Sequence, residues 1–93
     1  MEFEWDPVKA AANLQKHGIS FDAGVLVFSD KDRVDFDVSR ENDMEKRRKS
    51  VGLVNGRLFV VIYTLRGTVL RIISARRTNR SEEIRYGNRP LSP

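Results

Sequence analysis

Residues 51–65 read Val-Gly-Leu-Val-Asn-Gly-Arg-Leu-Phe-Val-Val-Ile-Tyr-Thr-Leu, two largely apolar runs separated by Asn55-Gly56. Asparagine and glycine both tolerate the positive φ that a type I′ turn requires. The stretch therefore predicts a β-hairpin in which Val54 pairs with Arg57. A second turn is expected at Arg66-Gly67, which would return the chain along a third strand.

These turns also predict which side chains share a face, because successive residues of a strand point to opposite sides of the sheet. A pairing of Leu65 with Thr68 across the second turn would leave the larger apolar set on one face, and we expect the N-terminal helices to cover it. That face would carry Val51, Leu53, Leu58, Val60, Ile62, Val69, Ile73 and Ala75, with Arg47, Lys49, Thr64 and Arg71 at its polar end. The other face would carry Phe59, Val61, Leu70 and Ile72 among Arg48, Ser50, Gly52, Tyr63, Ser74 and Arg76. We expect Ile84 and Tyr86 of a terminal helix to cover part of this second face.

The residues before the hairpin predict a short strand and two helices. Phe3-Glu4-Trp5 is typical of a strand. Asp6-Pro7 begins a helix, with aspartate as N-cap and proline in the first turn, and Gly18 ends it. Ser20 could cap a second helix that reaches about Phe28.

The remaining segments complete the expected fold. The alternating residues 33–38 predict a half-exposed strand, and Thr78 or Asn79 could cap a helix ending near Gly87. The predicted fold class is α+β: a strand and two helices packed on a mainly antiparallel sheet of four to five strands, followed by a short helix. Residues 1–93 are expected to form one domain, with 87–93 as a flexible tail.

Composition excludes several classes of protein. The chain has no cysteine, which excludes disulfides and thiolate chemistry. The N-terminus is charged from Glu2 onward, so a secretory signal is not expected, and the longest apolar run is too short to span a bilayer. We therefore expect a cytoplasmic protein with no membrane association.

Charge is distributed very unevenly along the chain. Residues 1–45 hold eleven acidic and five basic side chains, whereas residues 46–93 hold twelve basic and two acidic ones. The basic half is rich in arginine, whose planar guanidinium group suits phosphate binding and stacking on bases. The pattern favours a nucleic-acid partner, although a basic surface without a ligand has the same composition.

A series of motifs resembles one known family of proteins. The chain carries, in this order, Glu4-Trp5-Asp6-Pro7-x-Lys9, Asn13-x-x-Lys16-His17-Gly18-Ile19-x-Phe21, Val27-Phe28-x-Asp30, Glu45-x-Arg47, Val51-Gly52, Tyr63-Thr64-x-Arg66-Gly67 and Ile72-Ile73-Ser74-Ala75-Arg76-Arg77. Together they resemble the BrnT family of toxins over most of the chain. The resemblance implies a RelE-like fold, cleavage of RNA and arrest of translation. It also implies a BrnA-like antitoxin with a ribbon-helix-helix DNA-binding domain, through which the complex represses its operon. One position departs from the family, since Arg48 stands where an aromatic residue usually follows the Glu-x-Arg motif.

Cleavage of RNA without a metal ion needs a base for the 2′-hydroxyl, positive charge for the transition state and a proton for the 5′-oxygen. Among the motif residues, Glu45 is the expected base, and Arg47, Arg66 and Arg76 are the expected phosphate contacts. Glu45 could instead serve only as an ion-pair partner of Arg47 or Arg66.

Other side chains are candidates for RNA binding through charge or stacking. These are Trp5, Lys16, His17, Arg48, Tyr63, Arg71, Arg77 and Tyr86. His17 could equally complement the dipole of the helix that ends beside it, and Trp5 could be a packed anchor.

No metal site or cofactor is expected, since the acidic cluster Asp30, Asp32, Asp35 and Asp37 has no histidine near it and fits a solvated strand. The sequence thus predicts a metal-independent endoribonuclease toxin. The alternatives are a module that binds nucleic acid without cleaving it, or one that only binds an antitoxin.

Overall fold

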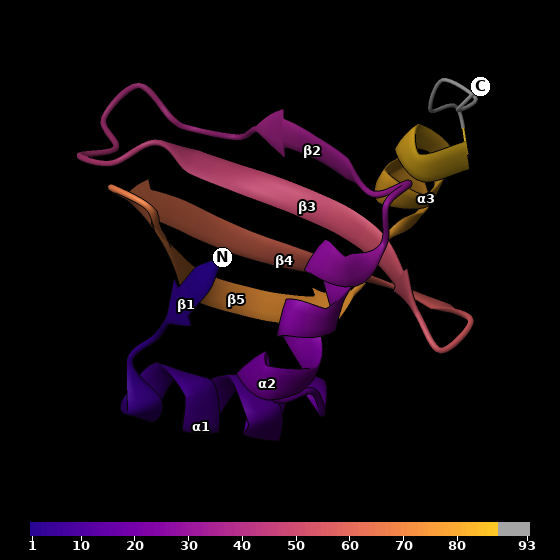
Figure 1. The fold of residues 1–93 in the computed structure, drawn as a ribbon, viewed down its shortest axis with the longest axis horizontal. Coiled ribbons are helices and arrows are strands. Elements are labelled where there is room, and N and C mark those ends of the chain that lie inside the picture. Colours follow the sequence, from indigo (N-terminus) through magenta and orange to yellow (C-terminus); the bar gives the residue numbers. More distant parts are fainter. Residues whose placement is uncertain (88–93) are drawn as a thin grey trace.

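The computed structural model describes residues 1–87, and its five strands form one mixed sheet in the order β1-β5-β4-β3-β2 (Figure 1). The strands are β1 (Glu2–Glu4), β2 (Val34–Asp37), β3 (Arg47–Val54), β4 (Arg57–Arg66) and β5 (Val69–Arg77). β1 runs parallel to β5, and the other neighbours are antiparallel. The predicted α+β class is confirmed. Of the tail predicted at 87–93, residues 88–93 lie outside the described residues.

The helices begin where the sequence predicts, and α1 and α3 also end there, whereas α2 is shorter than expected. In α1 (Pro7–His17), the Asp6 carboxylate accepts a hydrogen bond from the N–H of Val8 at 2.8 Å, and Gly18 ends the helix at φ 72°. Ser20 caps α2 (Phe21–Gly24), which tightens into the 3₁₀ helix η1 (Val25–Ser29) instead of continuing as an α-helix. The terminal helix α3 spans Arg80–Gly87.

The pairing of β3 with β4 follows the predicted register, with Val54 opposite Arg57 and positive φ at Asn55 and Gly56. The second turn differs from the predicted one: Arg66 pairs with Val69, whereas we expected Leu65 to pair with Thr68.

A further difference lies within β4 and β5, where a bulge shifts the register by one residue between Ile62 and Tyr63. Ala75 consequently opposes Val61, and Arg76 opposes Val60. The expected faces of Ser74, Ala75 and Arg76 are therefore wrong, because one inserted residue reverses every later side chain and no turn residue signals it.

The helices cover the faces in the opposite way from that expected. α1, α2 and η1 lie against the face that carries Val61, Tyr63, Leu70, Ile72 and Ala75. Within residues 1–87, α3 covers the face with Val51 and Val60 through Tyr86, and Ile84 points to solvent with half its surface exposed.

Close backbone approach explains this arrangement. A Cβ added to Gly52 would lie 2.9 Å from the carbonyl oxygen of Val27, and one added to Gly24 would lie 3.0 Å from the Cβ of Ala75. The small residues at these contacts thus admit the α2–η1 segment.

Asn13 bonds to β5 at Ala75, on the side where β1 pairs only with Val69–Arg71. Its Nδ2 donates to the carbonyls of Ala75 (2.8 Å) and Ile19 (3.1 Å), and its Oδ1 accepts from the N–H of Ala75 at 3.2 Å. The side-chain amide, which is buried, therefore replaces the backbone of a missing strand.

Replacement of Asn13 by alanine is expected to lower the free energy of unfolding by roughly 1–3 kcal/mol, because three buried backbone groups would lose their partner. Urea unfolding followed by circular dichroism measures it, with the exposed Gln15→Ala in the same helix as control. Equal stability of the two variants would show that water replaces the amide at no cost.

Candidate active site

A cleft of about 290 Å³ lies at the end of the sheet where β3 begins, β4 ends and β5 begins. Its strand residues Arg47, Thr64 and Arg71 lie on the sheet face of Val51 and Val60, against which Tyr86 of α3 packs. Its lining comes from α1, the loop before β3 and the three strands, and consists of Lys9, Asn42, Asp43, Met44, Glu45, Arg47, Thr64, Arg66, Arg71 and Ile73. Four of these side chains are basic and two are acidic, so the basic cleft, as we call it, is suited to an anion.

Glu45 and Arg66 form a two-pronged ion pair in the basic cleft. The Arg66 Nη2 donates to Oε1 of Glu45 at 2.8 Å, and Nε donates to Oε2 at 3.1 Å. The hydrogen bond from Arg66 lowers the pKa of Glu45, and the same bond raises the pKa of Arg66. Both side chains are about half exposed, so a ligand can reach them.

Two more arginines point into the basic cleft from neighbouring strands. Arg71 lies opposite Thr64 in the register and contacts Glu4 at 3.4 Å, with both side chains partly exposed. Arg47 lies opposite Thr64 on the other side, and its backbone N–H donates to the hydroxyl of Ser39 at 2.7 Å, which fixes the start of β3. The sheet thus places Arg47, Arg66 and Arg71 beside one carboxylate.

A second hollow of about 230 Å³ continues the basic cleft along α1. Lys9 and Ile73 line both, and the second adds Lys16 and His17 from the same helix. Lys9 and Lys16 are seven residues apart, which places them on one helix face. The two hollows therefore adjoin at Lys9 and Ile73, and we call the second one the α1 path.

Lys9 is the functional candidate that the sequence reasoning missed. It was visible in the Asp6-Pro7-x-Lys9 motif, and its spacing from Asn13 and Lys16 places all three on one face of α1. Only the tertiary structure shows that this helix face borders the end of the sheet where the basic cleft lies.

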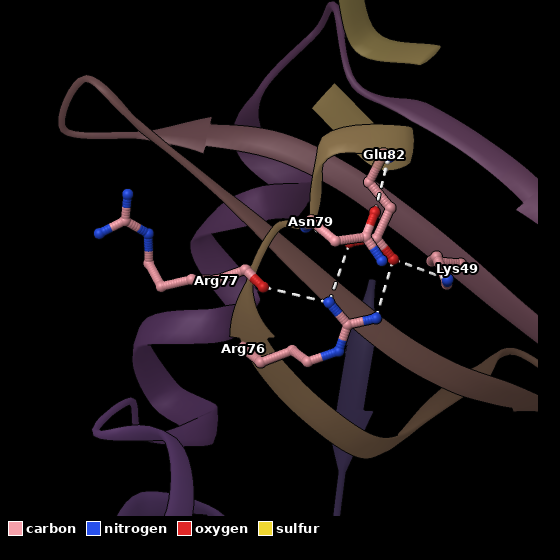
Figure 2. A network of polar contacts seen from close by, with 5 residues as sticks. All are labelled: Lys49, Arg76, Arg77, Asn79 and Glu82. Carbon is pink, nitrogen blue, oxygen red and sulfur yellow. Dashed lines mark hydrogen bonds and ion pairs between the residues drawn. The ribbon is translucent and has the colours of Figure 1, made fainter. Parts of the chain in front are cut away.

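Arg76 does not join these residues. It lies five positions beyond Arg71 on β5, a separation of roughly 16 Å along a strand. Its guanidinium donates to both carboxylate oxygens of Glu82 at 2.9 and 2.8 Å, and Lys49 donates to the same carboxylate at 2.7 Å (Figure 2). Arg76 thus connects the sheet to α3.

Glu82 is itself part of the cap of α3. Its N–H donates to the side chain of Asn79, and the N–H of Asn79 donates back to its carboxylate, both at 2.9 Å (Figure 2). Burial raises the pKa of this carboxyl, but the hydrogen bonds from Arg76 and Lys49 outweigh burial and lower it to about 2. The carboxylate is 3% exposed and carries its charge in the folded protein.

Arg48 and Tyr63 also lie outside the basic cleft, on the sheet face under the N-terminal helices. Both donate to the carboxylate of Asp35 on β2. The ring of Tyr63 is buried and packs edge-on against Phe28 at 5.3 Å. Burial and the bond to Asp35 raise the pKa of Tyr63 to about 12. The ring is thus enclosed in the folded chain.

The other aromatic candidates are packed as well. Trp5 contacts Phe21 at 5.9 Å between ring centroids. Tyr86 is buried and donates its hydroxyl to Asp30 at 2.7 Å. Arg77 lies over the ring of Phe59 at the opposite end of the sheet from Arg66.

Two further features are absent from residues 1–87. No group of three or more histidine, aspartate or glutamate side chains is placed to hold a metal ion there. No helix in that range is long and apolar enough to cross a membrane.

Comparison with known proteins agrees with the motif series. A family model described as "Ribonuclease toxin, BrnT, of type II toxin-antitoxin system" matches residues 5–82. A search of curated protein sequences finds no significant match. The matched range contains all of the basic cleft and the α1 path beside it. The chain belongs to the BrnT family of ribonuclease toxins of type II toxin–antitoxin systems.

Proposed function

We propose that the chain is a metal-independent endoribonuclease whose catalytic centre is the basic cleft, with Glu45, Arg47, Arg66, Arg71 and Lys9 as its working residues. The observation that carries the proposal is the Glu45–Arg66 pair, a carboxylate held beside three arginines in an accessible cleft. Lys16 and His17 extend the cleft and are proposed to bind the neighbouring nucleotides.

The proposed reaction is an in-line transfer within the RNA. Glu45 accepts the proton of the 2′-hydroxyl, and the 2′-oxygen forms a bond to phosphorus while the bond to the 5′-oxygen breaks. The products are a 2′,3′-cyclic phosphate and a free 5′-hydroxyl. Lys9 is proposed to give the 5′-oxygen its proton, since an alkylammonium group in general gives up a proton more readily than a guanidinium group does.

The arginines act on the charge that develops in the transition state. Arg66 and Arg71 can each direct paired N–H donors at non-bridging phosphate oxygens, and Arg47 adds a third positive group. These contacts strengthen as negative charge accumulates on phosphorus, which is the condition for catalysis.

Substrate binding would also activate Glu45. In the free protein the bond from Arg66 lowers the pKa of Glu45 and makes it a weak base. A bound phosphate that accepts both hydrogen bonds of Arg66 takes them away from Glu45, so these bonds no longer lower the pKa of Glu45. The carboxylate then becomes a stronger base when the substrate is in place.

The wider biological role rests on the family resemblance. We propose that the cleavage arrests translation in the cytoplasm and that a BrnA-like ribbon-helix-helix antitoxin neutralises the chain. Operator DNA would be bound only through that complex.

The test is cleavage of a single-stranded RNA by the purified chain in excess EDTA. Cleavage is expected to leave 2′,3′-cyclic phosphate ends and to be abolished by 2′-deoxy substitution at the cut site. Unchanged RNA at large excess of protein contradicts the proposal. Salt-sensitive binding without scission would identify a nucleic-acid-binding module instead.

A further inference from the structure

An apolar groove of about 480 Å³ lies away from the basic cleft and shares no lining residue with it. It runs between the C-terminal half of α1, the α2–η1 segment and the tip of the β3–β4 hairpin. Its lining consists of Leu14, Gly18, Ile19, Ser20, Ala23, Leu26, Val54, Asn55, Arg57 and Phe59.

Two half-exposed leucines border this groove. Leu14 is 50% exposed and Leu26 is 48% exposed, and they stand on different helices on the rim of the same hollow. Single exposed apolar residues are common, but two large ones beside an apolar hollow indicate a surface that a partner covers.

The charge of the groove restricts that partner. Arg57 is the one charged residue that the structure places in the lining, and Arg77 lies over the ring of Phe59 at 5.4 Å. RNA is a poor occupant, because its phosphate groups need hydrogen-bond donors and the rim of the groove carries leucines. A peptide segment with apolar side chains and a neighbouring carboxylate can pack against the leucines and form an ion pair with an arginine.

From these features, we infer that the groove is the docking site of the antitoxin, which inserts an apolar segment beside Leu14 and Leu26 and places a carboxylate against Arg57. The inference rests on the family assignment for the existence of an antitoxin, and on the groove for its location and chemistry.

The position of the groove also explains how docking could neutralise the toxin. Lys16 and His17 line the path to the basic cleft, and Gly18, the next residue, lines the groove. A partner seated in the groove therefore lies immediately beside the proposed RNA path and can cover it with a short extension.

The experiment measures binding of the purified, full-length cognate antitoxin by calorimetry. Leu14→Asp and Arg57→Glu are each expected to weaken binding at least about tenfold, because they place a charge against apolar or acidic groups. Val8→Asp is the matched control, since Val8 is 77% exposed on the same helix outside the groove, and it should bind within about twofold of wild type.

A second readout separates this inference from the proposed function. The Leu14→Asp and Leu26→Asp variants should cleave RNA like wild type yet escape inhibition by the antitoxin, and circular dichroism checks their folding. Binding of antitoxin to all variants as tightly as to wild type overturns the inference, whether or not the chain cleaves RNA. Self-association of wild type that Leu14→Asp abolishes, with antitoxin binding unchanged, also overturns it and assigns the groove to a second copy.

Discussion

The Arg66→Ala variant is expected to cleave RNA at least about a hundredfold more slowly than wild type, with a smaller change in RNA binding. In the free protein the two donors of Arg66 hold Glu45 in the basic cleft, and in the complex they pass to the phosphate. Removal of Arg66 takes away stabilisation of the transition-state charge and leaves Glu45 less well positioned. The measurement is the single-turnover cleavage rate of a labelled RNA at saturating protein.

Two controls make this result specific. Arg57→Ala removes the same charge from the other end of β4 and should leave the cleavage rate within about twofold of wild type. Arg66→Lys keeps the charge but loses the two-pronged geometry, so it should recover only part of the rate. If Arg66→Ala and Arg57→Ala cleave equally fast, the basic cleft is not the catalytic centre.

The Glu82→Gln variant is expected to lose about 3 kcal/mol of folding free energy, because it leaves Arg76 and Lys49 without a counter-charge in a largely buried network. Glutamine preserves the reciprocal cap with Asn79, so the change tests charge and not helix capping. Urea unfolding at pH 7 measures the loss. The matched control is Glu83→Gln at the adjacent exposed position, which should change stability little.

The same network predicts an acid dependence of stability. The pKa of Glu82 is about 2 in the folded chain against an ordinary value of 4.5, so the unfolded chain takes up this proton first as the pH falls. The contribution of Glu82 is complete above about pH 4.5 and declines as the pH falls toward 2. The stability difference between wild type and Glu82→Gln should therefore narrow across that interval. A difference that stays constant from pH 7 to pH 2 would contradict the charged network.

These two experiments also separate the roles of the arginines. The sequence places Arg47, Arg66 and Arg76 together as candidate phosphate contacts, and the structure separates Arg76 from the others by pairing it with Glu82. We propose that Arg76 holds α3 on the sheet, while Arg71 and Lys9 complete the phosphate site.

The sequence by itself determined the elements and their order. Asp6-Pro7, Gly18, Ser20 and Asn55-Gly56 act through their own backbone geometry or through hydrogen bonds within a few residues, so their effects are local and readable. Glu45 and Arg66 are also identifiable from the sequence as candidate site residues, because both belong to the motif series.

Only the tertiary structure decided which face the helices cover and which charges meet. The bulge in β4–β5 moved Ala75 and Arg76 to the opposite faces, and nothing in the turn residues encodes it. The contact between Gly52 and the backbone of Val27 depends on segments that are distant in sequence. Burial and the pairing of charges depend on such long-range packing, which is why only the structure shows that Arg76 pairs with Glu82 and that Lys9 lines the basic cleft.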